Sequence, residues 1–194
     1  MTKPCAVILA AGLSIRMGRN KLLLPLGHST VLGQFLRRFP FDLFEKVIVV
    51  YSESSVAKEA KQFPVELCHN QSPETGKSHS IQLGLKACRT KNAIMFFVAD
   101  QPLLQQTTIK KLVRLSQKNP GHIVLPVVND IQRNPVIFPA EFHYELNILQ
   151  DNYGGREVIR NNPGKIVRQS FHSADEFLDI DTVEMYQRVV DLWK

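Results

Sequence analysis

The stretch "LAAGLSIRMGRNKLLLPLG", residues 9–27, decides the fold, because an apolar run stops there at small residues and a basic loop follows. The apolar run starts at residue 6 and has the character of a buried strand. Cations beside a core cost free energy unless an anion binds among them. The stretch therefore predicts a strand followed by a phosphate-binding loop, in which Arg16 binds phosphate oxygens bidentately and Lys21 adds a compact charge. An ordinary basic surface loop is the alternative interpretation.

The rest of the chain alternates strand-like runs with amphipathic helical segments, and we find no repeat or linker. Continuously apolar runs at 47–50 and 94–98 indicate strands buried on both faces of a parallel sheet. This alternation predicts an α/β fold, a three-layer sandwich with a mostly parallel sheet, whose ligands bind beyond the carboxyl ends of the strands. A length of 194 residues favours a single domain, 1–194. The predicted strands are Cys5–Ala10, Lys46–Tyr51, Val65–His69, Ala93–Val98, His122–Val127, Asn134–Phe138 and Lys165–Phe171.

Helical periodicity lies between these strands. Apolar residues recur at helical spacing after residue 31, after Ser78, after residue 108 and near the end of the chain. Ser78 is predicted to be the N-cap of its helix. The core stripes are Leu32, Phe35, Leu36 and Phe39; Ile81, Leu85 and Cys88; Ile109, Leu112 and Val113; and Val183, Tyr186, Val190 and Trp193.

Carboxylates follow two of the later runs. Asp100 comes directly after a buried strand, where a carboxylate needs a cation, and magnesium is the partner that also bridges phosphates. A turn-forming role is the alternative. Asp181 is a candidate for the second metal carboxylate. Alternatively, Asp181 and Glu184 form a capping box at the last helix, or Thr182 is the cap and leaves Asp181 to bind a ligand.

Two polar loops add further candidates. The loop 70–80 leads into a helix start rich in hydroxyls, which favours an anion or a base edge, although a plain capped helix is equally consistent. The loop 150–156 precedes another expected helix; a simple connector with a solvated Arg156 is its alternative.

Composition excludes several classes of protein. The net charge of +6 comes from scattered residues, so we expect no nucleic-acid binding. No apolar run has the length of a membrane span, and the first residues lack the pattern of a signal peptide, so we expect no membrane partner and a cytoplasmic location. The 3 cysteines, Cys5, Cys68 and Cys88, match no metal or CxxC spacing and are predicted to be buried, reduced thiols.

The opening stretch also resembles the signature LAAGxSxRMGxxKxLLP of the molybdenum cofactor cytidylyltransferases, in the MobA-like nucleotidyltransferase superfamily. The resemblance continues in order along nearly the whole chain. "GKSHSIQLGL" resembles GMSxSLxxGL, "ADQPLL" resembles GDQPLL, and "RNPVIF" resembles G[HN]PVLF. "DNYGGREVI" is similar to GDxGARxLL, and "DIDTVE" is similar to DIDTPED. The chain departs from the pattern at Lys77, where Met is usual, and at Arg133, where Gly is common; both add charge near the expected substrate side.

The resemblance implies a Rossmann-like nucleotide-diphospho-sugar transferase fold and a magnesium-dependent reaction, with Mn²⁺ as an alternative metal. A terminal phosphate of the molybdenum cofactor would attack the α-phosphorus of CTP and release pyrophosphate. A molybdoenzyme or its chaperone is an expected partner. The implied roles are catalysis for Arg16, Lys21 and Asp100; nucleotide binding for Leu9, Ala10, Ala11, Gly12, Arg16, Lys21, Ser78 and Ser80; metal binding for Asp100 with Asp181, or with Asp179 in its place; and acceptor binding for Asn134, Pro135, Asp151 and Arg156.

Ala11 bears on the base. Guanylyl-transferring relatives usually carry LAGG where this chain has LAAG, and the extra methyl group leaves less room for a purine, which favours CTP. Two other functions share parts of this pattern. A sugar-phosphate or alditol-phosphate nucleotidyltransferase would keep the phosphate loop and change the acceptor. A non-catalytic chaperone for the molybdenum cofactor would not need the metal carboxylates.

Overall fold

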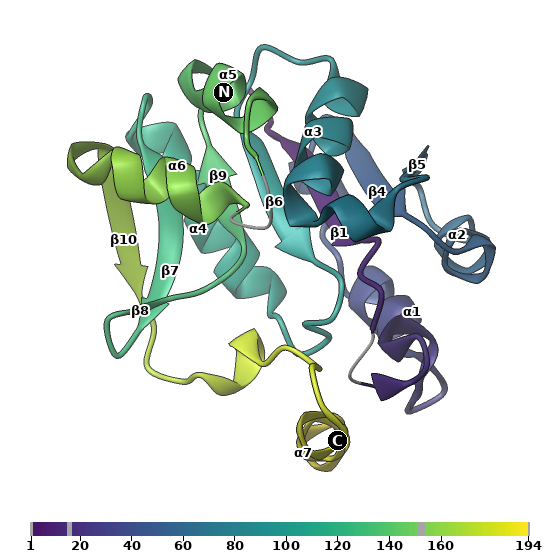
Figure 1. Cartoon of the computed structure of the whole chain (residues 1–194). Coiled ribbons are helices and arrows are strands. Elements are labelled where there is room, and N and C mark those ends of the chain that lie inside the picture. The colour runs from purple at the N-terminus through teal and green to yellow at the C-terminus, as the bar shows by residue number, and fades with distance from the viewer. Residues whose placement is uncertain (1, 15–16, 151–153, 194) are drawn as a thin grey trace.

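The central strand of the sheet is β1 (Cys5–Ala10), which pairs in parallel with β4 (Val47–Tyr51) and β6 (Ile94–Val98). The computed structural model describes residues 2–14, 17–150 and 154–193. The strand order is β10-β7-β9-β6-β1-β4-β5, with β8 attached to β7 (Figure 1). β9 runs antiparallel to β6 and β7, and β8 runs antiparallel to β7, whereas the other pairs of this sheet are parallel. The predicted mostly parallel α/β sheet is confirmed.

The predicted strands lie within two residues of their expected bounds. The largest shift is at β9, which begins at Val136, since Pro135 has no N–H to donate to a ladder. The remaining strands are β2 (Pro25–Leu26), β3 (Ser29–Thr30), β5 (Glu66–His69), β7 (Ile123–Val128), β8 (Ile131–Gln132), β9 (Val136–Phe138) and β10 (Ile166–Ser170), and the helices are α1 (Val31–Arg37), α2 (Ser54–Ala60), α3 (Lys77–Cys88), α4 (Gln106–Lys118), α5 (His143–Asn147), α6 (Gly155–Asn161) and α7 (Val183–Leu192).

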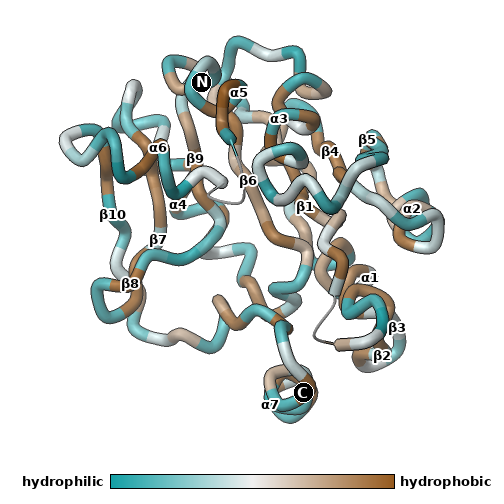
Figure 2. Tube along the Cα trace, in the orientation of Figure 1, coloured by the Kyte–Doolittle hydropathy of each residue, from teal (hydrophilic) through white to brown (hydrophobic). Residues whose placement is uncertain are grey.

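Two apolar layers sandwich the sheet, because successive β1 side chains point to opposite faces. Ala6 and Ile8 belong to the layer covered by α1, α2 and α4, whereas Cys5 and Val7 belong to the layer covered by α3, α5 and α6. Figure 1 shows α3, α5 and α6 on the near face, and Figure 2 shows the hydrophobic residues concentrated along the central strands. No helix in the described part of the chain has the length and apolar character of a membrane span.

Helix α3 lies unusually close to β1 at Gly84. A Cβ atom at this position would lie 2.4 Å from Val7 Cγ1, so a larger residue would push the helix off the sheet. This close approach fixes the N-terminal end of α3 beside the carboxyl end of β1, the edge at which the sequence places its ligand.

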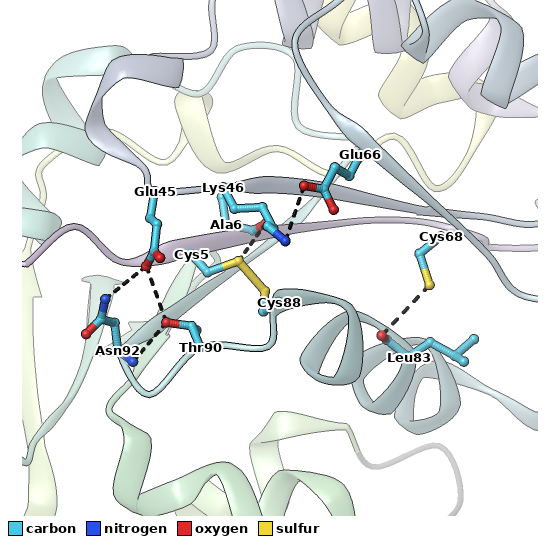
Figure 3. The surroundings of a disulfide bond; sticks show 10 residues. All are labelled: Cys5, Ala6, Glu45, Lys46, Glu66, Cys68, Leu83, Cys88, Thr90 and Asn92. Carbon is cyan, nitrogen blue, oxygen red and sulfur yellow. Dashed lines mark hydrogen bonds and ion pairs between the residues drawn. A yellow bond between two sulfur atoms is a disulfide. The ribbon is translucent and has the colours of Figure 1, made fainter.

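The expected state of the cysteines is wrong for one pair. Cys5, at the start of β1, and Cys88, at the end of α3, form a disulfide with their Cα atoms 6.3 Å apart (Figure 3). Both side chains point into the layer between β1 and α3, a proximity that a sequence separation of 83 conceals. Cys68 remains a thiol, half-buried rather than buried, and its burial raises its pKa.

Candidate active site

A cavity of about 500 Å³ lies beyond the carboxyl ends of β1 and β6. Residues 9–13 and Val98 line its floor, and Lys21 and Leu22 line one wall. Pro73, Glu74, Gly76, Lys77 and Ser80 line the opposite wall, at the start of α3, and Asp100 and Asp181 lie at the edge. Strand β1, the Lys21 turn, the α3 start and the β6 end therefore meet around one cleft, as the strand–helix alternation predicts.

Lys21 is the cation at the centre of the acidic edge. Its Nζ donates to Asp100 Oδ2 and, at 2.8 Å, to Asp181 Oδ1. Its backbone N–H donates to Ser14 Oγ at 3.3 Å, which ties the turn to the loop after β1. Asn20 caps the short helix Lys21–Leu23 by accepting from the N–H of Leu22. Burial by itself would lower the pKa of Lys21, but the two carboxylates outweigh it and raise the pKa, so the ammonium stays charged.

The two carboxylates come from distant parts of the chain. Asp100 lies two residues after the end of β6. Its backbone carbonyl accepts a hydrogen bond from the N–H of Ile180 at 3.1 Å, and this bond holds the 179–181 segment at the cleft. Thr182, rather than Asp181, caps α7, by accepting from the N–H of Met185 at 3.3 Å. The capping-box interpretation of Asp181 is therefore wrong, and the alternative with Thr182 as the cap is confirmed.

Asp179 is a third acidic residue close to this edge. Its burial, together with the charges of Asp100 and Asp181, raises its pKa to about 6, while the charge of Lys77 and a hydrogen bond with Gln101 lower it. Its Oδ1 atom is buried and has no hydrogen-bond partner among the described residues. Asp181 lines the cavity and pairs with Lys21, whereas Asp179 does not line it, so this geometry favours Asp181 as a ligand-facing carboxylate.

The acidic edge fits a magnesium or manganese ion shared with phosphates. The buried Oδ1 of Asp100 has no hydrogen-bond partner in the described part of the chain, and a hard cation would satisfy it. The described residues contain no cluster of three or more metal-ligating side chains. Two carboxylates suffice when substrate phosphates supply further oxygen ligands, which is the usual arrangement for Mg²⁺.

The predicted serines have different positions. Ser80 lines the cavity and accepts a hydrogen bond from the buried Asn70 side chain at 3.0 Å. Ser78 is buried, accepts from the N–H of Gly154 at 3.3 Å and donates to the carbonyl of Gln150, so it fastens the loop before α6 rather than lining the cavity. The prediction that Ser78 caps α3 is wrong. The helix begins at Lys77, so its N-cap is Gly76, two residues before Ser78, and the φ of 95° at Gly76 favours glycine.

A second pocket of about 170 Å³ adjoins the first. Leu9, Lys77 and Val98 line both pockets. Apolar side chains make up most of the second pocket, with Phe96 and Phe138 in T-shaped contact 6.0 Å apart. The two pockets are therefore neighbours: the charged side chains of Lys21, Asp100 and Asp181 line the first, and aromatic and aliphatic residues make up most of the second.

The predicted acceptor residues lie partly at this second pocket. Asn134 and Arg156 line it, whereas Pro135 is buried outside the lining. Asp151 and Arg16 lie outside the described residues, so their roles stay predictions. Reasoning from single residues did not predict Lys77 at the junction; its departure from the cytidylyltransferase pattern was the available signal.

Comparison with known proteins agrees with this architecture. Residues 6–168 match the family model of the MobA-like NTP transferase domain. The chain is 27% identical over 199 residues to the purine catabolism protein PucB of Bacillus subtilis, covering 94% of each. It is 28% identical over 134 residues to the molybdenum cofactor cytidylyltransferase of Escherichia coli, covering 68% of this chain and 67% of that protein.

Solved structures show the same fold at lower sequence identity. The crystal structure of Rv0371c from Mycobacterium tuberculosis superimposes with a TM-score of 0.84 at 22% identity, covering 98% of each chain. A complex of the same protein with manganese superimposes with a TM-score of 0.78 at 21% identity, covering 98% of this chain and 99% of that one.

Proposed function

The chain belongs to the MobA-like NTP transferase family, and from this premise we propose that it transfers CMP from CTP to a terminal phosphate of a molybdenum-cofactor-like acceptor. In the balanced reaction, an oxygen of the acceptor phosphate forms a bond to the α-phosphorus. The bond from the α-phosphorus to the bridging oxygen of the β-phosphate breaks, and pyrophosphate leaves with the electron pair. We expect this reaction in the cytoplasm, with the product delivered to a molybdoenzyme or its chaperone.

One observation carries the proposal: Lys21 is held by Asp100 and Asp181 at the edge of a cavity with a small-residue floor. Ala10, Ala11 and Gly12 let a phosphate or ribose approach the backbone closely. Lys21 is placed to neutralise the charge that develops on the leaving pyrophosphate. A chaperone that only carries the cofactor would not need this pairing of a cation with two carboxylates.

Asp100 and Asp181 would hold the divalent ion. When bound, magnesium or manganese neutralises phosphate charge and orients the triphosphate. The residues themselves position the ammonium of Lys21, which would turn from the carboxylates toward phosphate oxygens as the nucleotide binds. The side chains of Lys21 and Asp100 are largely buried, which strengthens their electrostatic interaction, because a partly buried site screens charges less than water does.

The base preference rests on Ala11, which is buried and lines the cavity. Its methyl group occupies space that a purine would use, and a difference of this size is about 1–3 kcal/mol. We therefore expect CTP to bind more tightly than GTP. Calorimetric titration of both nucleotides in the presence of Mn²⁺ measures this preference, and Ala11→Gly should narrow it.

Turnover of the purified protein tests the reaction. Each nucleoside triphosphate is offered with the molybdenum cofactor, and pyrophosphate release is measured for wild type, Lys21→Ala and Asp100→Asn. The matched control is Lys46→Ala, since Lys46 also forms an ion pair, with Glu66 at 3.2 Å, away from the cleft (Figure 3). We expect both cleft variants to lose nearly all turnover and the control to keep it. No pyrophosphate release by wild type with any nucleoside triphosphate would favour the chaperone instead, and wild-type turnover in Asp100→Asn would refute the catalytic role of this carboxylate.

A further inference from the structure

We propose, resting on the proposed function, that Lys77 is the specificity-determining residue that binds the phosphate of the acceptor at the junction of the two pockets. The acceptor class is a phosphate monoester carried on a compact, flat ring. The body would occupy the second pocket, and the phosphate would lie at the boundary with the nucleotide pocket.

The position of Lys77 is the first argument. It is the one cation among the described residues that lines both pockets. Its stem lies against the N-cap of α6, where a Cβ atom at Gly154 would come within 3.2 Å of Lys77 Cδ. This contact limits the directions that the stem can take. The Lys77 side chain therefore lies at the boundary of the two pockets, where the proposed acceptor phosphate would approach the nucleotide.

The charge of Lys77 is the second argument. Lys77 is the first residue of α3, whose first turn contains no acidic side chain and whose N-cap makes no side-chain hydrogen bond. A cation there is unfavourable, because the N-terminus of a helix carries the positive end of its dipole. Lys77 forms no ion pair with any other described residue that would offset this cost. A bound anion would offset it, and local rules are commonly broken at functional sites.

Asp179 does not form an ion pair that would offset the charge of Lys77. Its charge and that of Lys77 influence each other, as the lowering of the Asp179 pKa by Lys77 indicates, but the two groups lie beyond the 4.0 Å that defines an ion pair. Lys77 is also exposed, so its charge can reach an incoming ligand. An acceptor phosphate can therefore bind Lys77 without first breaking an ion pair within the described residues.

The second pocket supplies the chemistry of the acceptor body. Beyond the residues that it shares with the first pocket, three phenylalanines and three branched aliphatic residues line it, and Arg156 and Asn134 are its polar groups other than Lys77. These six apolar residues are Phe96, Phe97, Phe138, Ile81, Val136 and Ile159. Its volume of about 170 Å³ suits a small flat body better than a long chain. A flat ring against this floor would carry its phosphate toward Lys77.

The test uses phenyl phosphate as the probe and phenol as its uncharged analogue. Calorimetry measures their binding to wild type, Lys77→Met, Lys77→Arg and the control Lys86→Met. Methionine keeps most of the stem's length and removes the charge, and Lys86 is an exposed lysine of the same helix. Each titration is run alone and with the α,β-methylene analogue of CTP and Mn²⁺ present, so that the nucleotide pocket is occupied in one arm.

We expect Lys77→Met to weaken phenyl phosphate binding by about tenfold to a hundredfold, as for the loss of one charge-assisted hydrogen bond. Lys77→Arg should retain most of the affinity, Lys86→Met should match wild type, and phenol should bind all four proteins alike. Equal binding of phenyl phosphate to Lys77→Met and wild type would overturn the proposal, as would no binding to wild type.

The same experiment separates this proposal from the proposed function. If the CTP analogue fails to bind wild type, the nucleotidyl-transfer reaction is wrong. In that case the titrations without nucleotide still show whether phenyl phosphate binding depends on Lys77. Phenyl phosphate binding that vanishes once the analogue is bound would place the probe in the nucleotide pocket and overturn the proposal.

Discussion

Replacing Lys21 with methionine should destabilise the protein and strengthen its response to divalent metal. The substitution keeps the length of the side chain but leaves Asp100 without its cation. The side chains of Lys21 and Asp100 are 14% and 13% exposed, whereas that of Asp181 is 44% exposed, so most of the loss comes from the Asp100 pair. Removing one partner of a buried pair costs about 3–5 kcal/mol, and a surface pair costs about 0–1 kcal/mol.

Because this pair is partly screened by solvent, we expect the lower end, about 3 kcal/mol. For a chain of this size, each kcal/mol shifts Tm by about 2–4 °C, so Tm should fall by about 6–12 °C. The double variant Lys21→Met/Asp100→Asn should regain much of this loss, because it removes the uncompensated charge. Lys46→Met, which breaks the exposed pair with Glu66, is the control and should change the free energy of unfolding by about 1 kcal/mol or less.

Thermal denaturation followed by circular dichroism, with and without Mn²⁺, measures these differences. Mn²⁺ should raise the Tm of Lys21→Met more than that of wild type, because the metal no longer competes with an ammonium group for the same oxygens. The reasoning is refuted if Lys21→Met is no less stable than Lys46→Met. A double variant as unstable as the single one would also refute it, since the unpaired charge would then not be the cause.

Three further predictions follow from the described contacts. Thr182→Ala should lower the free energy of unfolding by about 1 kcal/mol through loss of the α7 cap and leave turnover nearly unchanged, whereas Asp181→Asn should lose turnover with little change in Tm. At low ionic strength Lys77→Met should raise the free energy of unfolding and Lys86→Met should lower it, each by about 0.3–1 kcal/mol. The signs differ because these lysines lie at opposite ends of the α3 dipole, and chemical denaturation with and without salt measures both changes. Cys88→Ser should cost about 2–5 kcal/mol under oxidising conditions and Cys68→Ser much less, and equal losses would contradict the disulfide as a stabilising link.

The strands could be predicted from the sequence because β-branched and apolar runs buried on both faces leave a strong local signal. Val47–Tyr51 and Ile94–Val98 begin within one residue of their predicted bounds for this reason. The start of α3 could not be predicted as well, since Gly76 begins the helix through backbone conformation alone, while Ser78 has a favourable side chain but binds Gly154. A capping residue in sequence is a local preference, and a tertiary contact overrode it.

The site was predictable in its residues and less so in its contacts. Lys21, Asp100 and Asp181 each lie within a recognisable motif. No local rule, however, indicates that the Lys21 ammonium donates to both carboxylates. The choice between Asp179 and Asp181 depends on which side chain reaches the cavity, which only the path of the 179–181 segment decides. The disulfide was equally hard to predict, because it depends on the packing of α3 against β1 between residues that are 83 positions apart in the sequence.

Three places where local preference and structure disagree lie around the cleft. Lys77 puts a cation at the positive end of a helix, Asp100 buries an oxygen without a hydrogen-bond partner among the described residues, and Gly76 starts a helix with no side-chain cap. Each is unfavourable taken alone, and a phosphate ligand with a divalent ion would relieve the first two together. A chain optimised only for stability would place a neutral residue at 77 and would give the buried Oδ1 of Asp100 a hydrogen-bond partner. That both positions keep their charges at the same cleft is the physical reason to assign the cleft to anionic substrates, and it makes added stability in Lys77→Met the expected counterpart of lost acceptor binding.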